Sequence, residues 1–253
     1  MAGFLSTLRR IYLSLYNWTV FVGWFQVLYF AVKALREGGP TTVYGFVERP
    51  LQLAQTAAVM EILHGLVGLA RSPVSATLPQ IGSRLFLTWG ILWSFPETRA
   101  HVLVSSLVIS WSITEIIRYS FFGMKEAFGF APSWLLCLRY STFLILYPTG
   151  ITSEVGLIYV ALPYIKASEK YCIRMPNKWN FSFDYFSASI LALAIYIPGM
   201  FICIFFVYPS QAMCRQKLFS LSSDHITNIC RKSTHVPVYA WAAQEGSLQV
   251  KDS

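Results

Sequence analysis

The chain has 253 residues, of which 55% are hydrophobic, 16% aromatic and only 13% charged. Soluble domains carry about a quarter charged residues, so this chain has too few to cover a globular surface, and we expect lipid to be its solvent. The net charge of +8 would suggest nucleic acid as the partner of a soluble protein. Here the basic residues lie mainly between apolar runs, which favours lipid headgroups or an anionic substrate and disfavours nucleic acid.

Six apolar segments have about the length of a helix that crosses a bilayer, which needs ~20 residues. In chain order, the expected helices cover approximately residues 12–32, 51–70, 78–95, 100–120, 134–161 and 183–208. We expect Pro79 to start the third helix, and Pro198 with Gly199 to interrupt the sixth. The sequence therefore predicts an all-α, polytopic membrane protein with six transmembrane helices in one bundle.

Ionisable side chains inside these spans are costly, at ~2.5–3.5 kcal/mol each on insertion scales, and they indicate a functional site or a buried pair. Glu115 and Arg118 are three residues apart, and we interpret them as a salt bridge within one helix near a membrane end. The full set is Glu61, His64, Arg84, Glu115, Arg118, Arg139, Tyr147 and Glu154.

Two polar stripes follow from helical spacing. Glu61 and His64 share one face of the second expected helix, and Gln80 and Arg84 share a face of the third. Glu61 and Arg84 either pair between helices or contribute to a substrate site, and the sequence leaves both interpretations open. We interpret His64 as a hydrogen-bonded interior residue.

Several kinds of chemistry lack their motifs. The histidines are scattered, and no cysteine pair or H-E-x-x-H pattern has the spacing of metal ligands. No G-x-G-x-x-G follows a predicted strand, and no G-x-S-x-G is present. We therefore expect no metal site, no nicotinamide chemistry and no serine hydrolase.

The fifth span contains an unusual stretch, LYPTGITSE, residues 146–154. Seven residues separate Tyr147 from Glu154, which returns both to within ~20° of one helix face, ~10 Å apart along the axis. Pro148 removes a backbone donor, and Gly150 permits a close approach of another chain or a ligand. Such a broken backbone at membrane depth needs protein or a cavity beside it. The alternative is a kinked packing helix with Glu154 at the membrane interface.

These residues resemble a known family. The segments LYPTGITSE, SWSITEIIRYSFF, AVMEILHG, SRLFLTWG and PNKWNFSFDY are similar to the 3-hydroxyacyl-CoA dehydratases of fatty-acid elongation, first called protein-tyrosine-phosphatase-like proteins. The resemblance runs from Met1 to about Gly199. It implies a six-helix endoplasmic-reticulum membrane protein with cytosolic termini, an orientation that Lys and Arg counts alone leave open.

The resemblance also implies the reaction and the site. The family removes water from a very-long-chain (3R)-3-hydroxyacyl-CoA to give the trans-2-enoyl-CoA. CoA is part of the substrate, so no cofactor is implied, and the implied partners are acyl-CoA, membrane lipids and the other elongase enzymes. The family's catalytic pair matches Tyr147 and Glu154. Its supporting residues match Glu61, Gln80, Arg84, Arg139 and Gly150.

The chain departs from a phosphatase and from its relatives in two places. A tyrosine phosphatase needs a cysteine followed six positions later by an arginine, whereas the equivalent span GLVGLAR has Gly65 at the cysteine position. We therefore expect no phosphatase activity. The sequence after Gly199 does not match the family's basic tail, so we expect a dehydratase domain over residues 1–208 and a divergent, poorly ordered tail over 209–253.

Dehydration needs a base for the C2 proton and an acid for the departing hydroxyl. We expect Glu154 to be the base and Tyr147 the donor, although the reverse assignment stays open. Lys125, Arg139, Arg9 and Arg10 are candidates for the CoA phosphates. We further expect Tyr147 and Glu154 to open into one cavity with at least one of Glu61, Gln80, Arg84 or Arg139. The rival functions are a catalytically silent elongase scaffold or phosphotyrosine-protein binder, and a transporter or channel.

Overall fold

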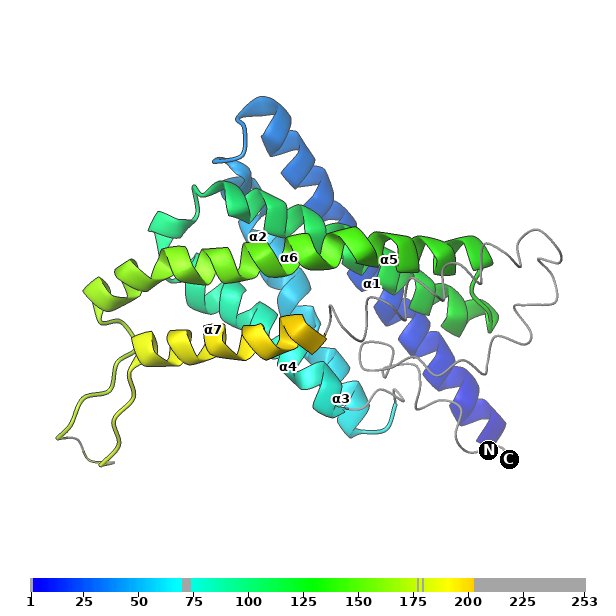
Figure 1. The fold of residues 1–253 in the computed structure, drawn as a ribbon. Coiled ribbons are helices and arrows are strands. Elements are labelled where there is room, and N and C mark those ends of the chain that lie inside the picture. The colour runs from blue at the N-terminus through cyan, green and yellow to red at the C-terminus, as the bar shows by residue number, and fades with distance from the viewer. Residues whose placement is uncertain (1, 70–73, 177, 179, 203–253) are drawn as a thin grey trace.

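The protein is built from helices that pack side by side (Figure 1). Its structure is a computed structural model that describes residues 2–69, 74–176, 178 and 180–202. In the described residues the only strand-like pairing is an antiparallel bridge between Ile173 and Phe183. The helical elements are α1 (Ala2–Glu37), α2 (Val43–Ala57), α3 (Val59–Leu66), α4 (Val74–Leu85), the π-helix η1 (Phe86–Trp93), the 3₁₀-helix η2 (Pro96–Thr98), α5 (Val102–Phe128), α6 (Ser133–Ser168) and α7 (Tyr185–Ile202).

All six expected segments contain helix, so the all-α prediction is confirmed for the described residues. Three helical stretches are long and apolar enough to cross a membrane: Phe4–Glu37, Val102–Phe128 and Ser133–Ser168. The outward face of α1 is apolar along its length, with Leu15 64% exposed and Phe25 56% exposed. An apolar stripe of this kind is expected where a helix faces lipid.

The second and third expected helices differ from the prediction in their bounds. The second begins earlier, at Val43, and is divided at Ala58, where the amide donates to the Gln55 carbonyl at 3.2 Å in a tighter 3₁₀-type turn. No proline or glycine lies at that position to signal the break. The third begins at Val74, so the prediction that Pro79 starts it is wrong, and the proline lies inside α4.

The end of the third segment widens into a π-helix, η1, a geometry that is rare and often lies at functional sites. Gly90 lies within η1 and faces α7. The Tyr185 hydroxyl of α7 donates to the Gly90 carbonyl at 2.9 Å, and a Cβ at position 90 would lie only 2.4 Å from that hydroxyl. The glycine therefore permits α7 to dock on η1.

The prolines of α6 and α7 do not interrupt their helices, so the expected breaks at Pro148 and Pro198 are wrong. Prolines are tolerated in such helices when neighbouring groups satisfy the backbone. In α6 the hydroxyls of Thr149 and Thr152 donate to carbonyls one turn earlier, those of Ile145 at 3.0 Å and Pro148 at 2.8 Å. The sixth expected helix extended to residue 208, and residues 203–208 lie outside the described part.

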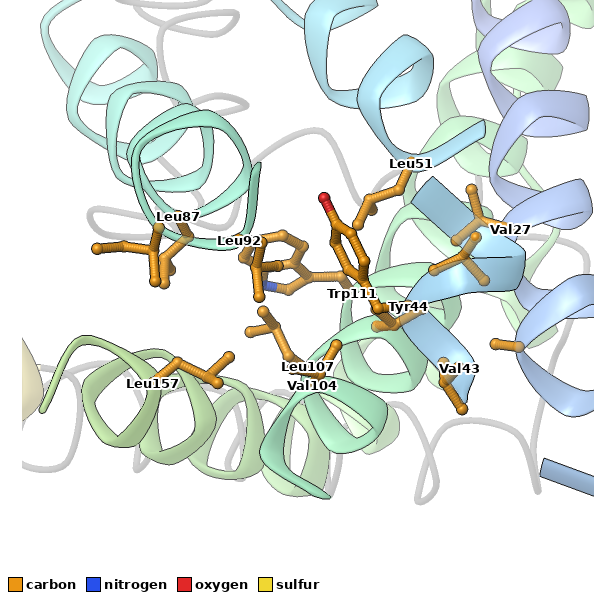
Figure 2. Packing of buried hydrophobic residues seen from close by; sticks show 14 of the residues in the cluster. Val27, Val43, Tyr44, Leu51, Leu87, Leu92, Val104, Leu107, Trp111 and Leu157 are labelled. Atoms are coloured by element: carbon orange, nitrogen blue, oxygen red, sulfur yellow. The ribbon is translucent and has the colours of Figure 1, made fainter. Parts of the chain in front are cut away.

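The helices join in the order α2, α1, α5, α6 and α7, each packed along the next. Figure 2 shows the labelled core side chains converging from these elements: Val27 of α1, Leu51 of α2, Leu92 of η1, Trp111 of α5 and Leu157 of α6. Trp111 thus contributes to an apolar core, and a carboxylate that reaches this part of the interior is a buried group.

Glycine sets the separation of α5 and α6 near the candidate site. A Cβ at Gly156 would lie 2.5 Å from Leu103, so the glycine lets the two helices approach closely there. Gly150 is different, because its added Cβ would lie 3.9 Å from the Ser110 Cβ, which is an ordinary contact. The expected close approach of another chain at Gly150 is therefore not seen among the described residues, and a close approach of a ligand there stays a prediction.

Candidate active site

Glu154 lies inside the bundle, with 8% of the residue exposed. The indole Nε1 of Trp111, on α5, donates to Oε1 at 2.9 Å, and the hydroxyl of Tyr196, on α7, donates to Oε2 at 2.6 Å. Both carboxylate oxygens are therefore held, each by a different helix. Glu154 is therefore held between helices, and its depth relative to a membrane interface stays a prediction.

Tyr147 lies seven residues earlier on the same uninterrupted helix, and its ring is half-buried beside Phe143, with the ring centroids 4.8 Å apart. Continuous α-helix keeps the spacing that the sequence predicts, so Tyr147 and Glu154 share one face ~10 Å apart along the axis. The shared cavity between them stays a prediction.

A chain of charges crosses the bundle beside this pair. Glu61 of α3 accepts hydrogen bonds from Arg118 and Tyr119 of α5. Arg118 also donates to Glu115 at 3.0 Å, and Glu115 accepts from Arg84 of α4. Each carboxylate thus faces at least one guanidinium, and the four charges balance.

This row of alternating charges decides two interpretations of the sequence. Glu61 and Arg84 do not pair with each other, because each binds the Glu115 and Arg118 pair on α5 instead. The intrahelical salt bridge between Glu115 and Arg118 is confirmed. Glu115 lies midway along α5, which continues to Phe128, and is only 1% exposed; its expected place near a membrane end stays a prediction.

Arg84 connects the charge chain to Glu154. Its guanidinium lies over the Trp111 ring, 5.5 Å from the ring centroid, in a cation–π arrangement. Trp111 presents its face to Arg84 and its N–H to Glu154. Among the described residues no cation forms an ion pair with Glu154; Arg84 acts on it electrostatically across the indole.

The remaining predicted site residues occupy two places. Gln80 lies one turn before Arg84 on α4, half-buried, and its Nε2 has no hydrogen-bond partner among the described residues. It is therefore a buried donor left unsatisfied, which in a native structure calls for an explanation. Gly150 is buried against α5 in a layer of hydroxyls, where Ser110 and Thr149 are 3.1 Å apart and Ser153 donates to Ser106 at 2.9 Å.

Arg139 lies away from the carboxylate, fifteen residues and ~22 Å along α6 from Glu154. Its guanidinium stacks on Phe121, 5.0 Å from the ring centroid, and the Lys125 ammonium lies 5.8 Å from the same ring. Arg10 of α1 donates to the Glu126 carbonyl at 3.2 Å. Three of the four cations expected to bind the CoA phosphates thus gather near the end of α5 and the beginning of α6.

His64 is confirmed as an interior residue with a hydrogen bond. It is 3% exposed, its Nε2 lies 2.9 Å from the Tyr12 hydroxyl, and the rings of Tyr12 and Tyr16 meet its imidazole edge-to-face. These contacts close the end of α3 against α1.

Trp111 and Tyr196 are the contacts of Glu154 that the sequence did not reveal. Each lies in an apolar stretch, where an aromatic residue with a polar tip is expected to contribute to the core. The one available signal is that a buried Tyr or Trp hydroxyl or N–H needs a polar partner, and spacing along one helix cannot identify that partner on another.

The comparisons with known proteins agree on one family. The model of the family "Protein tyrosine phosphatase-like protein, PTPLA" matches residues 55–241. The match therefore reaches past Gly199, where the resemblance seen in the sequence ended, into the part that the structure does not describe. No solved structure matches the chain.

Named relatives extend this finding. The chain is 81% identical over 199 residues to the very-long-chain (3R)-3-hydroxyacyl-CoA dehydratase PASTICCINO 2A of Oryza sativa, covering 79% of this chain and 90% of that protein. It is 77% identical over 199 residues to the very-long-chain (3R)-3-hydroxyacyl-CoA dehydratase PASTICCINO 2 of Arabidopsis thaliana, again covering 79% of this chain and 90% of that protein. It is 38% identical to very-long-chain (3R)-3-hydroxyacyl-CoA dehydratase 2 of Homo sapiens, covering 86% and 84%.

Proposed function

The chain belongs to the protein tyrosine phosphatase-like (PTPLA) family, and from this premise we propose that it is a very-long-chain (3R)-3-hydroxyacyl-CoA dehydratase. It is then a hydro-lyase, which removes water from the 3-hydroxyacyl-CoA to give the trans-2-enoyl-CoA. The observation in the structure that best supports this function is a buried carboxylate, Glu154, which the described residues hold through two neutral donors.

The reaction assigns a task to each group. Glu154 takes the C2 proton, the electron pair of that C–H bond forms the C2–C3 double bond, and the C3–O bond breaks. The departing hydroxide takes up a proton that Tyr147 donates, and water leaves. Glu154 is suited to the first task because a carboxylate without a cationic partner in an apolar interior is a stronger base than an ion-paired one. A phenol is suited to the second because it donates to developing negative charge.

The positions of the other groups support binding of an acyl-CoA. The acyl chain needs apolar walls, which the helices provide, and the buried amide nitrogen of Gln80 near Arg84 has no partner among the described residues. The phosphates of CoA need cations outside the lipid, for which the cluster of Arg10, Lys125 and Arg139 is suited. The elimination of water is not a redox reaction and requires only an acid and a base besides the substrate. The proposal therefore includes no cofactor.

The proposal also covers placement in the cell. Three long helices are supplemented by α2 with α3, α4 with η1, and α7 to make six membrane spans. The protein resides in the endoplasmic-reticulum membrane with cytosolic termini and works beside the other elongase enzymes. A silent scaffold is a weaker candidate, because it would have no use for a carboxylate buried without a cation, which costs stability.

Purified full-length protein incubated with a (3R)-3-hydroxyacyl-CoA tests the function, with the 2-enoyl-CoA product detected by mass spectrometry. We expect turnover by the natural chain and a loss of about a hundredfold or more for Tyr147→Phe, since general acids contribute that much. Tyr159→Phe is the matched control, because Tyr159 is on the same helix and 70% exposed. Absence of enoyl product from well-folded natural protein would refute the dehydratase function.

A further inference from the structure

Trp111 and Tyr196 surround the carboxylate of Glu154 without being assigned to the reaction. Their hydrogen bonds have ordinary lengths, 2.9 Å to Oε1 and 2.6 Å to Oε2, and they come from α5 and α7, on different sides of α6. A carboxylate bound through one oxygen turns freely about its last bond. One that is bound through both oxygens by separate helices has a fixed plane.

We propose that Trp111 and Tyr196 are positioning residues that together fix the Glu154 carboxylate for removal of the C2 proton. The inference rests on the proposed dehydratase function. A carboxylate has about four lone-pair sites, and the two donors occupy two of them. The other two remain for the substrate, in a plane that the donors define.

Fixing the carboxylate is worthwhile because proton removal depends on direction. The proton at C2 is transferred only when a lone pair of the base points along the C–H bond, and a misplacement of ~1 Å costs about a hundredfold in rate. A free glutamate loses side-chain entropy each time it reaches that geometry. Donors from the surrounding helices remove this loss because they hold the geometry before substrate binds.

The neutrality of both donors matters as much as their geometry. A guanidinium in either place would bind the carboxylate more tightly but would balance its charge and weaken it as a base. An indole N–H and a phenol O–H orient the oxygens while leaving the negative charge uncompensated by an ion pair. The arrangement therefore combines orientation with basicity.

Arg84 extends the positioning to α4. Its guanidinium is bound by Glu115 and lies over the face of Trp111, so the indole is held between a fixed cation and the carboxylate. This contact gives a physical reason for Arg84 to support the reaction from a place where Trp111 separates it from Glu154. Arg84 acts through Trp111, just as Trp111 acts through Glu154.

Steady-state kinetics of Tyr196→Phe and Trp111→Phe test the proposal in purified full-length protein. Each variant removes one hydrogen bond to a charged group, and we expect kcat to fall about tenfold or more with little change in KM. With substrate deuterated at C2, the isotope effect on kcat should rise, because proton removal becomes slower relative to the other steps. A variant that merely folds less well has fewer active molecules but an unchanged isotope effect and KM.

Two controls separate positioning from packing. Tyr185→Phe removes a hydroxyl of α7 that donates to the Gly90 carbonyl and not to Glu154, so it should lower stability and leave the isotope effect unchanged. Tyr196→Phe added to Glu154→Gln should cause no further loss beyond that of Glu154→Gln, because the donor acts only through the carboxylate.

The outcomes are distinct. A natural chain without dehydratase activity overturns both the function and this inference. An active natural chain whose Tyr196→Phe and Trp111→Phe variants keep kcat, or lose it without a larger isotope effect, overturns the inference alone. An additional loss in the double variant with Glu154→Gln also overturns it.

Discussion

Two polar clusters lie between the helices of this bundle, and the carboxylates in them differ in their partners. Glu61 and Glu115 face guanidiniums, from Arg118 and from Arg84, and form a chain of alternating charges. Glu154 lies on the other side of Trp111 from Arg84 and, within the described part of the chain, accepts hydrogen bonds from an indole and a phenol alone. Both clusters connect the same central helix, α5, to its neighbours.

The difference indicates a division of tasks. A carboxylate paired with a guanidinium is stabilised as an anion, so it holds helices together and is a poor proton acceptor. A carboxylate held by neutral donors keeps a higher affinity for a proton, and a general base requires that affinity. Within a membrane both arrangements satisfy a buried charge, but only the second is suited to chemistry.

The comparison is tested most severely by Glu154→Gln, which retains the shape of the side chain and removes its basicity. We expect turnover to fall by about a hundred- to ten-thousandfold, the contribution of a general base. The amount of folded, membrane-inserted protein should be nearly unchanged. Substantial retained turnover would exclude Glu154 as the base, and gel filtration in detergent is the check on folding.

Arg118→Met tests the other cluster and should act on stability. It leaves Glu61 and Glu115 without the cation they share, and breaking a buried ion pair from one side costs about 3–5 kcal/mol. We expect a large drop in the thermal-unfolding temperature in detergent.

The matched control for Arg118→Met is Lys33→Met, which removes an exposed pair with Glu37 at 4.0 Å. Such a pair contributes at most about 1 kcal/mol. Equal stabilities of the two variants would show that the charge chain contributes little to the fold.

Arg84 contacts both clusters, through Glu115 and through Trp111. We expect Arg84→Lys to lower kcat about tenfold, less than Glu154→Gln does. Lysine keeps a positive charge for Glu115, but its ammonium lacks the flat guanidinium that stacks on Trp111. The thermal-unfolding temperature should change little. A loss of stability as large as that of Arg118→Met, with kcat per folded molecule unchanged, would place Arg84 in the structural cluster alone.

Truncation after Tyr208 should have the smallest effect. All members of both clusters precede Gly199, so the specific activity of inserted protein should stay within about twofold of the full chain. The family match continues to residue 241, so truncation after Tyr208 tests whether the rest of the matched region is needed for activity. Loss of turnover in a well-inserted truncated protein would show that the C-terminal part contributes to the site, and protease protection of the inserted helices checks insertion.

The sequence by itself determined the helical class and the pair on α6. Long apolar segments must satisfy their backbone groups internally, so helices are the expected outcome. Tyr147 and Glu154 share a face because seven residues nearly complete two helical turns. The salt bridge of Glu115 with Arg118 follows from the same periodicity. In each case the relation is local, within one helix, and helical geometry fixes it.

The tertiary structure decided which helix each polar group meets. Nothing in the spacing indicates that Glu61 and Arg84 each bind α5, or that Trp111 and Tyr196 hold Glu154. It also decided that α6 continues through Pro148 and Pro163 without a break, an outcome that a proline in the sequence does not predict. Partners on different helices depend on the rotation and separation of those helices, which are set by the packing of many apolar side chains together and not by any single periodicity.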